Sequence, residues 1–150
     1  MQLFLGTIEN KIDIKGRISI PADYRSILKN NTFKGVILYH SFVSKCIEGC
    51  TLERMEQMAN ASDNLDLFSE KQDEINSLIF SDARKLAYDT TGRILIPKDL
   101  LNFAEIKDNA IFVGCGKTFQ IWNKDLFLNK EKLIREKAKQ KHPSLSFKLF

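Results

Sequence analysis

Histidine and cysteine are scarce in this 150-residue chain, which has two of the former and three of the latter. Cys46, Cys50 and Cys115 lack C-x-x-C spacing, and no set of metal-ligating residues gathers around His40 or His142 in the sequence. We therefore expect neither a metal site nor a disulfide framework. Reduced thiols of this kind are typical of a cytosolic protein.

Long apolar runs are also missing, so no membrane-spanning segment is expected. The N-terminus lacks the cationic and then apolar stretches of a secretory signal. The sequence contains no Gly-rich phosphate loop and no Ser-His-Asp set, so we expect neither an enzyme nor a cofactor. A hydrophobic content of 43% in 150 residues predicts one compact domain.

Positive charge is unevenly distributed. The formal net charge is +4, and residues 129–142, with six Lys or Arg against two Glu, account for all of that excess. Overall basicity is therefore weak evidence for a nucleic-acid partner. This segment is interpreted first as a solvated helix face, with non-specific attraction to DNA or to a membrane surface as alternatives. Its interleaved apolar residues would pack on the body or on another subunit: Leu126, Leu133, Ile134 and Ala138.

A nine-residue motif is present twice. Residues 13–21 read DIKGRISIP and residues 89–97 read DTTGRILIP, with six of nine positions identical. Asp three residues before Gly indicates a tight turn, because Asp bonds the backbone ahead and Gly accepts positive φ. The alternation that follows predicts a half-buried strand, and Pro then ends the strand and opens a helix. Each copy should therefore fold as strand, turn, strand and helix.

Apolar periodicity predicts the remaining elements. Thr7–Ile14 should pair with Arg17–Ile20 as a hairpin, with Ile8, Ile12 and Ile14 facing inward, and residues 86–89 should pair likewise with residues 93–96. Ile75, Leu78 and Ile79 should form the buried stripe of a helix over residues 69–80, after a polar linker at residues 60–66. Further strands are predicted over residues 36–39, 46–48, 111–113 and 119–122, and further helices over residues 21–30, 51–59, 97–104 and 124–141.

The doubled D-x-x-G-R-I-x-I-P motif resembles the MraZ family of bacterial DNA-binding transcriptional regulators, which is related to the AbrB/SpoVT group. Leu3-Phe4-Leu5-Gly6 and Phe119-Gln120-Ile121-Trp122 add to the resemblance, which extends over about residues 3–122. It implies an α+β, mainly β fold: a pseudo-twofold AbrB-like swapped-hairpin barrel of two repeated β-β-α-β halves, with connecting and C-terminal helices. It also implies rings of identical subunits that bind short direct repeats in double-stranded DNA, upstream of cell-division and cell-wall genes.

On this basis the whole chain, residues 1–150, is expected to form a single domain. Its two halves should cover about residues 3–60 and 80–125, joined by a helix over about residues 69–80. A C-terminal helix and tail should occupy residues 124–150, where the alternation of Leu145, Phe147 and Leu149 with polar residues suits an added strand.

Two interpretations are open for Arg17, which flanks Gly16 together with Lys15. The guanidinium could contact phosphates or a guanine edge, or it could pair with Asp13 and brace the turn. The resemblance favours DNA contact, with neighbouring Lys11 and Ser19 as further DNA-binding candidates.

Arg93 occupies the matching place in the second copy, but Thr91 replaces the lysine and Leu95 replaces the serine. A structural or interface role is favoured for Arg93, with direct DNA contact as the alternative. Asp13 and Asp89 are interpreted as turn-forming residues, together with Gly16 and Gly92, rather than as a catalytic carboxylate pair.

The resemblance thus implies a DNA-binding transcriptional regulator, acting as a repressor, in the cytoplasm and associated with the nucleoid. No membrane partner and no small-molecule substrate are expected. Outward-facing Leu95 and Trp122 and the alternating tail predict a homo-oligomer. The alternative is a protein-interaction scaffold or antitoxin-like module of the same fold, which would act through the C-terminal helix and tail.

Overall fold

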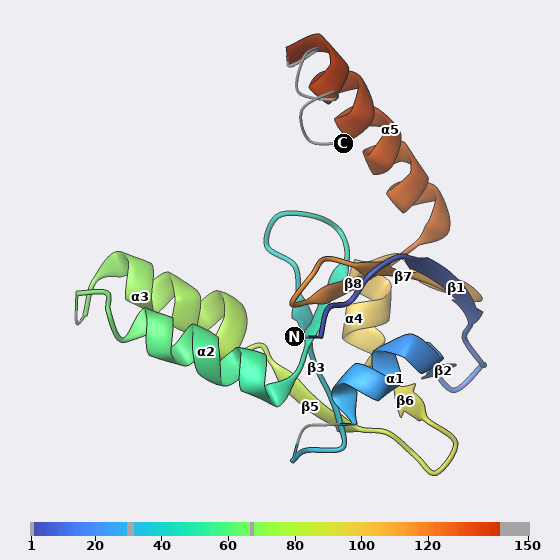
Figure 1. Cartoon of the computed structure of the whole chain (residues 1–150), viewed down its shortest axis with the longest axis horizontal. Coiled ribbons are helices and arrows are strands. Elements are labelled where there is room, and N and C mark those ends of the chain that lie inside the picture. Colours follow the sequence, from blue (N-terminus) through green and yellow to red (C-terminus); the bar gives the residue numbers. More distant parts are fainter. Residues whose placement is uncertain (1, 30–31, 67, 142–150) are drawn as a thin grey trace.

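The computed structural model describes residues 2–29, 32–66 and 68–141; the predicted tail strand therefore lies outside the described residues. The fold is α+β and mainly β (Figure 1). The strands are β1 (Thr7–Lys11), β2 (Arg17–Ser19), β3 (Gly35–His40), β4 (Ile47–Cys50), β5 (Arg84–Ala87), β6 (Arg93–Leu95), β7 (Asn109–Gly114) and β8 (Phe119–Trp122). The helices are α1 (Ala22–Leu28), α2 (Leu52–Ser62), α3 (Glu70–Ile75), the π-helical turn η1 (Asn76–Phe80), α4 (Lys98–Phe103) and α5 (Lys124–Lys141).

Strands from the two copies of the motif pair with each other. Six antiparallel strands form one sheet in the order β1-β7-β8-β4-β3-β5, and β2 and β6 form a second, two-stranded sheet. The predicted hairpins are therefore wrong: β1 pairs with β7 and β5 with β3, while the link from β1 to β2 is reduced to a bridge between Ile12 and Ile18. Alternation had identified Ile8 and Ile12 as inward-facing, but it carries no information about the partner strand.

The strand registers are related by a pseudo-twofold axis. In the two-stranded sheet Ile18 lies opposite Ile94, its counterpart in the repeat, so the axis passes between them. In the large sheet the axis passes between β4 and β8, where Glu48 lies opposite Gln120. Each half therefore completes the sheet of the other.

One apolar core lies between the large sheet and the β2–β6 pair with its helices. Phe4, Tyr24, Phe112 and Phe119 form its centre, with ring centroids 5.0 to 6.0 Å apart. The isoleucines of both motifs are almost completely buried in it: Ile18, Ile20, Ile94 and Ile96. Full burial of such a side chain contributes about 1.5 to 3 kcal/mol, so the repeated motif is first of all a core-forming unit.

A smaller cluster lies on the opposite face of the sheet, beneath α2. It contains Ile37, Tyr39, Cys50 and Met55. Thr51 caps α2 by accepting a hydrogen bond from the N–H of Arg54 at 3.0 Å. The helix continues to Ser62, so it takes up the start of the predicted polar linker.

Three predicted orientations are wrong. Leu78 is 45% exposed, because the helix from residue 70 ends in a π-helical turn that changes the direction of its side chains. Ile14 is fully exposed, because the turn that begins at Asp13 interrupts the strand alternation. Trp122 does not face outward: it is 3% exposed and packs against Phe127 of α5.

Helix α5 contacts the body through its first two turns and then extends away from it (Figure 1). Lys130 Nζ lies 4.8 Å above the Trp122 ring and donates a hydrogen bond to Ser44 Oγ at 2.8 Å. Beyond Glu131 the helix side chains are exposed, including Leu133 and Ile134.

Candidate nucleic-acid interface

The first motif forms a turn held by its aspartate. Asp13 Oδ1 accepts the N–H groups of Lys15 at 3.0 Å and of Arg17 at 2.8 Å, and Oδ2 accepts Arg17 Nε at 2.7 Å. Gly16 has φ of +90°, and its N–H returns to the Asp13 carbonyl at 3.0 Å. A glycine is needed there because L side chains rarely adopt this conformation.

The second motif repeats this geometry. Asp89 Oδ1 accepts the N–H groups of Thr91 at 2.9 Å and of Arg93 at 3.0 Å, and Oδ2 accepts Arg93 Nε at 3.0 Å. Thr91 adds a hydroxyl donor at 2.8 Å, and Gly92 has φ of +79°. The turn-forming assignments of Asp13, Gly16, Asp89 and Gly92 agree with these bonds, which are local enough to be read from sequence.

Both carboxylates are stabilised in their charged form. The N–H of Arg17 is the largest cause that lowers the pKa of Asp13, followed by the Arg17 guanidinium. The N–H of Arg93 lowers the pKa of Asp89, with further contributions from Thr91 and the Arg93 guanidinium. Hydrogen bonds to a carboxylate favour ionisation, so neither aspartate is poised to act as a general acid near neutral pH.

Each turn is anchored to the other half. The Gly16 carbonyl accepts the N–H of Ile96 at 2.9 Å, and the Gly92 carbonyl accepts the N–H of Ile20 at 3.1 Å. These two bonds extend the β2–β6 pairing to the turns themselves. Both turns are therefore fixed relative to one rigid two-stranded ribbon.

The outer face of this ribbon brings together residues from both motifs. Arg17 lies opposite Leu95, and Ser19 lies opposite Arg93, whereas Ile18 points into the core. Both arginine side chains are 36% exposed. Since each guanidinium uses Nε for its aspartate, Nη1 and Nη2 of both make no hydrogen bond to the part of the chain that the structure describes. Bracing the turn and contacting an outside ligand are thus compatible roles.

Lys11 is separated from this face. It shares the exposed side of β1 with Glu9, whose carboxylate binds Lys124 Nζ at 3.1 Å. Asn10 is on the other side and donates to the Ser19 carbonyl at 2.7 Å, which ties β1 to β2. This role of Asn10 was not predicted, because in the sequence Asn10 is only a polar residue on an apolar strand face.

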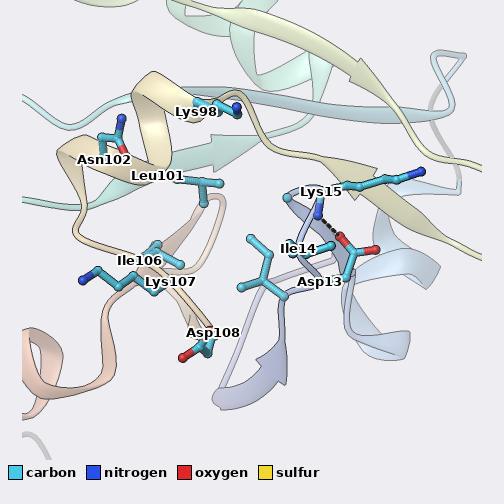
Figure 2. A pocket seen from close by; sticks show the side chains of 11 residues that line it. Asp13, Ile14, Lys15, Lys98, Leu101, Asn102, Ile106, Lys107 and Asp108 are labelled. Atoms are coloured by element: carbon cyan, nitrogen blue, oxygen red, sulfur yellow. Dashed lines mark hydrogen bonds between the residues drawn. The ribbon is translucent and has the colours of Figure 1, made fainter.

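A groove of about 470 Å³ lies beside the first turn. Figure 2 shows the turn with Asp13, Ile14 and Lys15 on one side and α4 with the loop after it on the other. Two further lysines that the sequence analysis did not single out, Lys98 and Lys107, line the α4 side. The motif alone gave no signal for them, because they approach the turn only through the interlocking of the two halves.

A second groove, of about 410 Å³, lies beside the second turn. Its cations, Arg25, Lys29 and Lys34, come from α1 and the residues before β3 of the first half. They too were missed. Thr91 stands in the second motif where Lys15 stands in the first. The second turn nevertheless has positive charge beside it, supplied by the cations of the first half.

Within the described residues there is no group of three or more His, Cys, Asp or Glu side chains that could hold a metal ion. Among the helices of the described part of the chain, none is both long and apolar enough to cross a bilayer.

Comparison with known proteins identifies the family. Residues 3–76 and 79–145 match the family described as "MraZ protein, putative antitoxin-like". A protein of Pelagibacter ubique (strain HTCC1062) named "Transcriptional regulator MraZ" is 43% identical over 145 residues, which cover 97% of this chain and 94% of that protein. Proteins of the same name from Rickettsia bellii (strain OSU 85-389) and Rickettsia canadensis (strain McKiel) are each 39% identical over 91% of this chain and 95% of their own lengths. The chain therefore belongs to the MraZ family, and the relatives compared are named as transcriptional regulators.

Proposed function

We propose that this protein is a sequence-specific DNA-binding transcriptional regulator that acts as a repressor. It would bind short direct repeats upstream of cell-division and cell-wall genes, as a ring of identical subunits at the nucleoid in the cytoplasm. The names of the relatives support regulation of transcription. The DNA target and the ring come from the resemblance of the doubled motif, and the geometry below gives them a physical basis.

The observation that carries this proposal is the outer face of the β2–β6 ribbon. A two-stranded antiparallel ribbon fits the major groove of B-form DNA, and an arginine is the side chain that most often reads guanine there. Arg17 meets the requirement because Asp13 fixes its Nε, which leaves the two terminal nitrogens of a pre-oriented guanidinium for a bidentate contact. Ser19 and Lys15 would add contacts to the backbone phosphates from the same half.

Arg93 is assigned mainly to the integrity of the ribbon, with direct DNA contact as a secondary role. Its guanidinium braces the second turn through Asp89, and its partner across the ribbon is Ser19. Loss of Arg93 would therefore loosen the face from which Arg17 projects. Lys11 stays a DNA-binding candidate only as a peripheral phosphate contact, because it shares its side of β1 with the Glu9–Lys124 ion pair.

Assembly supplies the affinity that one subunit lacks. A single ribbon makes few phosphate contacts, and such contacts weaken steeply as salt rises. When several identical ribbons on one rigid assembly meet repeats of matching spacing, the later binding events become intramolecular. The exposed apolar residues of the body, including Leu95, Phe42 and Val43, are candidates for contacts between subunits.

A second candidate function is neutralisation of a protein partner, in keeping with the family's printed description. The observation in its favour is helix α5, which carries Leu128, Leu133 and Ile134 with 47% to 57% exposure. Exposed apolar side chains on a projecting helix suit an apolar groove on another protein. On this reading the paired substitutions Leu133→Asp and Ile134→Asp would remove function and leave DNA binding unchanged.

Footprinting and gel shifts on DNA from upstream of the protein's own gene test the proposal. Protection of tandem repeats, with affinity that rises with repeat number and falls with salt, is the expected result. Equal affinity for one repeat and for an array would contradict the avidity argument. Binding to no duplex at all would overturn the proposed function and leave the protein-partner candidate.

A further inference from the structure

Arg25 of the first half is positioned by the second half. A Cβ atom built on Gly92 would collide with the Nη1, Cδ and Cζ atoms of Arg25, so the guanidinium lies against the glycine of the second turn. The backbone of Lys34 reaches the same turn, because its carbonyl accepts the N–H of Tyr88 at 3.3 Å. Arg25 and Lys34 are therefore held at the second turn, the first by packing and the second by a backbone hydrogen bond across the two halves.

These cations are available to an outside ligand. Arg25, Lys29 and Lys34 are exposed, and none of them forms a salt bridge within the described residues. The carboxylate that also lines the groove, Asp89, is already engaged by Arg93 and by backbone N–H groups. The groove thus presents three uncompensated positive charges beside the ribbon.

The three equivalent positions of the second half carry other residue types. Leu101 stands where Arg25 does, since both bond the proline that opens their helix: Leu101 N–H to the Pro97 carbonyl, Arg25 N–H to the Pro21 carbonyl. Asp108 stands where Lys34 does, and its carbonyl accepts the N–H of Ile12 at 2.8 Å.

Glu105 occupies the position of Lys29, eight residues after the proline in each half. Glu105 does not line the groove at the first turn, where the cations are Lys15, Lys98 and Lys107. The three positions that supply the cations of the second groove therefore carry no cation in the other half, and the two grooves take their positive charge from different positions of the fold.

We propose that Arg25, Lys29 and Lys34 form a groove that binds the phosphate backbone of duplex DNA next to the β2–β6 ribbon. This inference rests on the proposed DNA-binding function and extends it by dividing the work between the turns. The first turn supplies Arg17 for base reading. The second turn, together with the cations of α1 and of the segment between α1 and β3, binds the phosphates. Phosphate contacts fix the register of a protein on DNA without reading its sequence.

The partner is a polyanion, because three cations line one groove and no ion pair within the described residues compensates them. Thr90 and Ser26 also line the groove and place hydroxyl groups beside the cations. Arg, Lys, Ser and Thr side chains are the usual donors to DNA phosphates.

The test measures DNA affinity of the full-length protein as a function of salt, by fluorescence anisotropy. The probes are a random-sequence duplex and a duplex from upstream of the protein's own gene. The variant R25Q/K29Q/K34Q is compared with K132Q/K137Q/K139Q, which removes the same charge from exposed positions of α5. A third variant, Arg25→Lys, keeps the charge at the position that packs on Gly92, and circular dichroism checks the fold of all three.

The groove variant should bind both duplexes more weakly, by a similar factor. Each lost phosphate contact lowers the steepness of log affinity against log salt by about 0.9, so three should lower it by about 2 to 3 per engaged subunit. This corresponds to roughly 100- to 1,000-fold weaker binding near 0.1 M salt. The α5 variant and Arg25→Lys should keep a slope close to that of the unmodified protein.

An unchanged slope in the folded groove variant, while Arg17→Ala still abolishes operator binding, would overturn this inference and leave the proposed function standing. An equal loss of DNA affinity in the α5 variant would also overturn the inference, since affinity would then depend on net charge and not on the groove. Absence of binding to both duplexes by the unmodified protein would overturn the inference together with the proposed function.

Discussion

The carbonyl oxygen of Gly16 accepts the backbone N–H of Ile96 at 2.9 Å, so the turn of the first motif is bonded to the residue that follows β6 in the second. The reciprocal bond joins Gly92 to Ile20. Through these bonds the two copies form one ribbon with two turns, and neither turn can take its position without the other half. The candidate interface is for this reason a property of the whole fold.

Substitution of Gly92 by Ala should weaken both stability and DNA binding. Gly92 and Gly116 have similar positive φ, so either replacement should cost about 1–2 kcal/mol of unfolding free energy in urea titrations. A new Cβ at Gly92 also displaces Arg25, whereas at Gly116 it meets no atom within 4 Å. The Gly92→Ala variant should therefore lose DNA affinity in gel shifts, and Gly116→Ala should keep it; equal affinities would show that Arg25 needs no support from Gly92.

Acidification should destabilise the protein through the two turn aspartates. The folded pKa of Asp13 and of Asp89 lies below the ordinary value of 3.8, so the folded state binds fewer protons than the unfolded chain. Their contribution is then complete well above pH 3.8 and is lost as the pH falls through that value toward the folded pKa values. As the pH is lowered across this range, the urea midpoint of unfolding should fall less steeply for D13N/D89N than for the unmodified protein. Identical pH profiles of the two proteins would contradict the stabilising role assigned to the aspartates.

The three cysteines should differ in reactivity. Cys46 and Cys50 are buried, and burial raises the pKa of both thiols to about 12. Cys115 is exposed, although partial desolvation raises its pKa as well. Titration with an aromatic disulfide at about pH 8 should modify one thiol per chain in the native protein and three after unfolding, because the thiolate is the reacting form. Fast modification of all three would mean that the sheet opens readily near β4.

Light scattering or native mass spectrometry should find a mass several times that of the protomer in the absence of DNA. The physical reason is the exposure of large apolar side chains on the body, with Leu95 56%, Phe42 62% and Val43 70% exposed. The paired substitution of Phe42 and Val43 by Ser should lower the mass. A strictly monomeric protein at micromolar concentration would contradict assembly into a ring.

Local features of the fold could be predicted from sequence, and the pairings could not. Asp13 and Gly16 identified the turn because their interactions reach only four residues along the chain. The partner of β1 was predicted wrongly, since a strand's alternation is equally satisfied by any neighbour that offers an apolar face.

The candidate site divides in the same way. Arg17 could be singled out because it belongs to the repeated motif. Arg25 could not, because its place beside Gly92 depends on the interlocking of two segments about 67 residues apart. Trp122 was misjudged for a related reason: whether a strand face is open depends on the helix that follows it, and α5 covers this one.

The most direct test of the account compares Arg17→Ala, Arg17→Lys and Arg93→Ala with the unmodified protein. Operator binding is measured by gel shift on the upstream duplex, with circular dichroism and size-exclusion chromatography as controls of fold and assembly. Arg17→Ala should abolish operator binding and leave the fold and assembly unchanged, since a lost bidentate guanine contact costs about 1–3 kcal/mol at every engaged subunit. Arg17→Lys should retain non-specific binding only, because an ammonium keeps the charge and lacks the bidentate geometry. Arg93→Ala should instead disturb assembly or stability. Two results would contradict this assignment of the two motifs: normal operator binding by Arg17→Ala, or an Arg93→Ala variant that is fully assembled and still loses DNA binding.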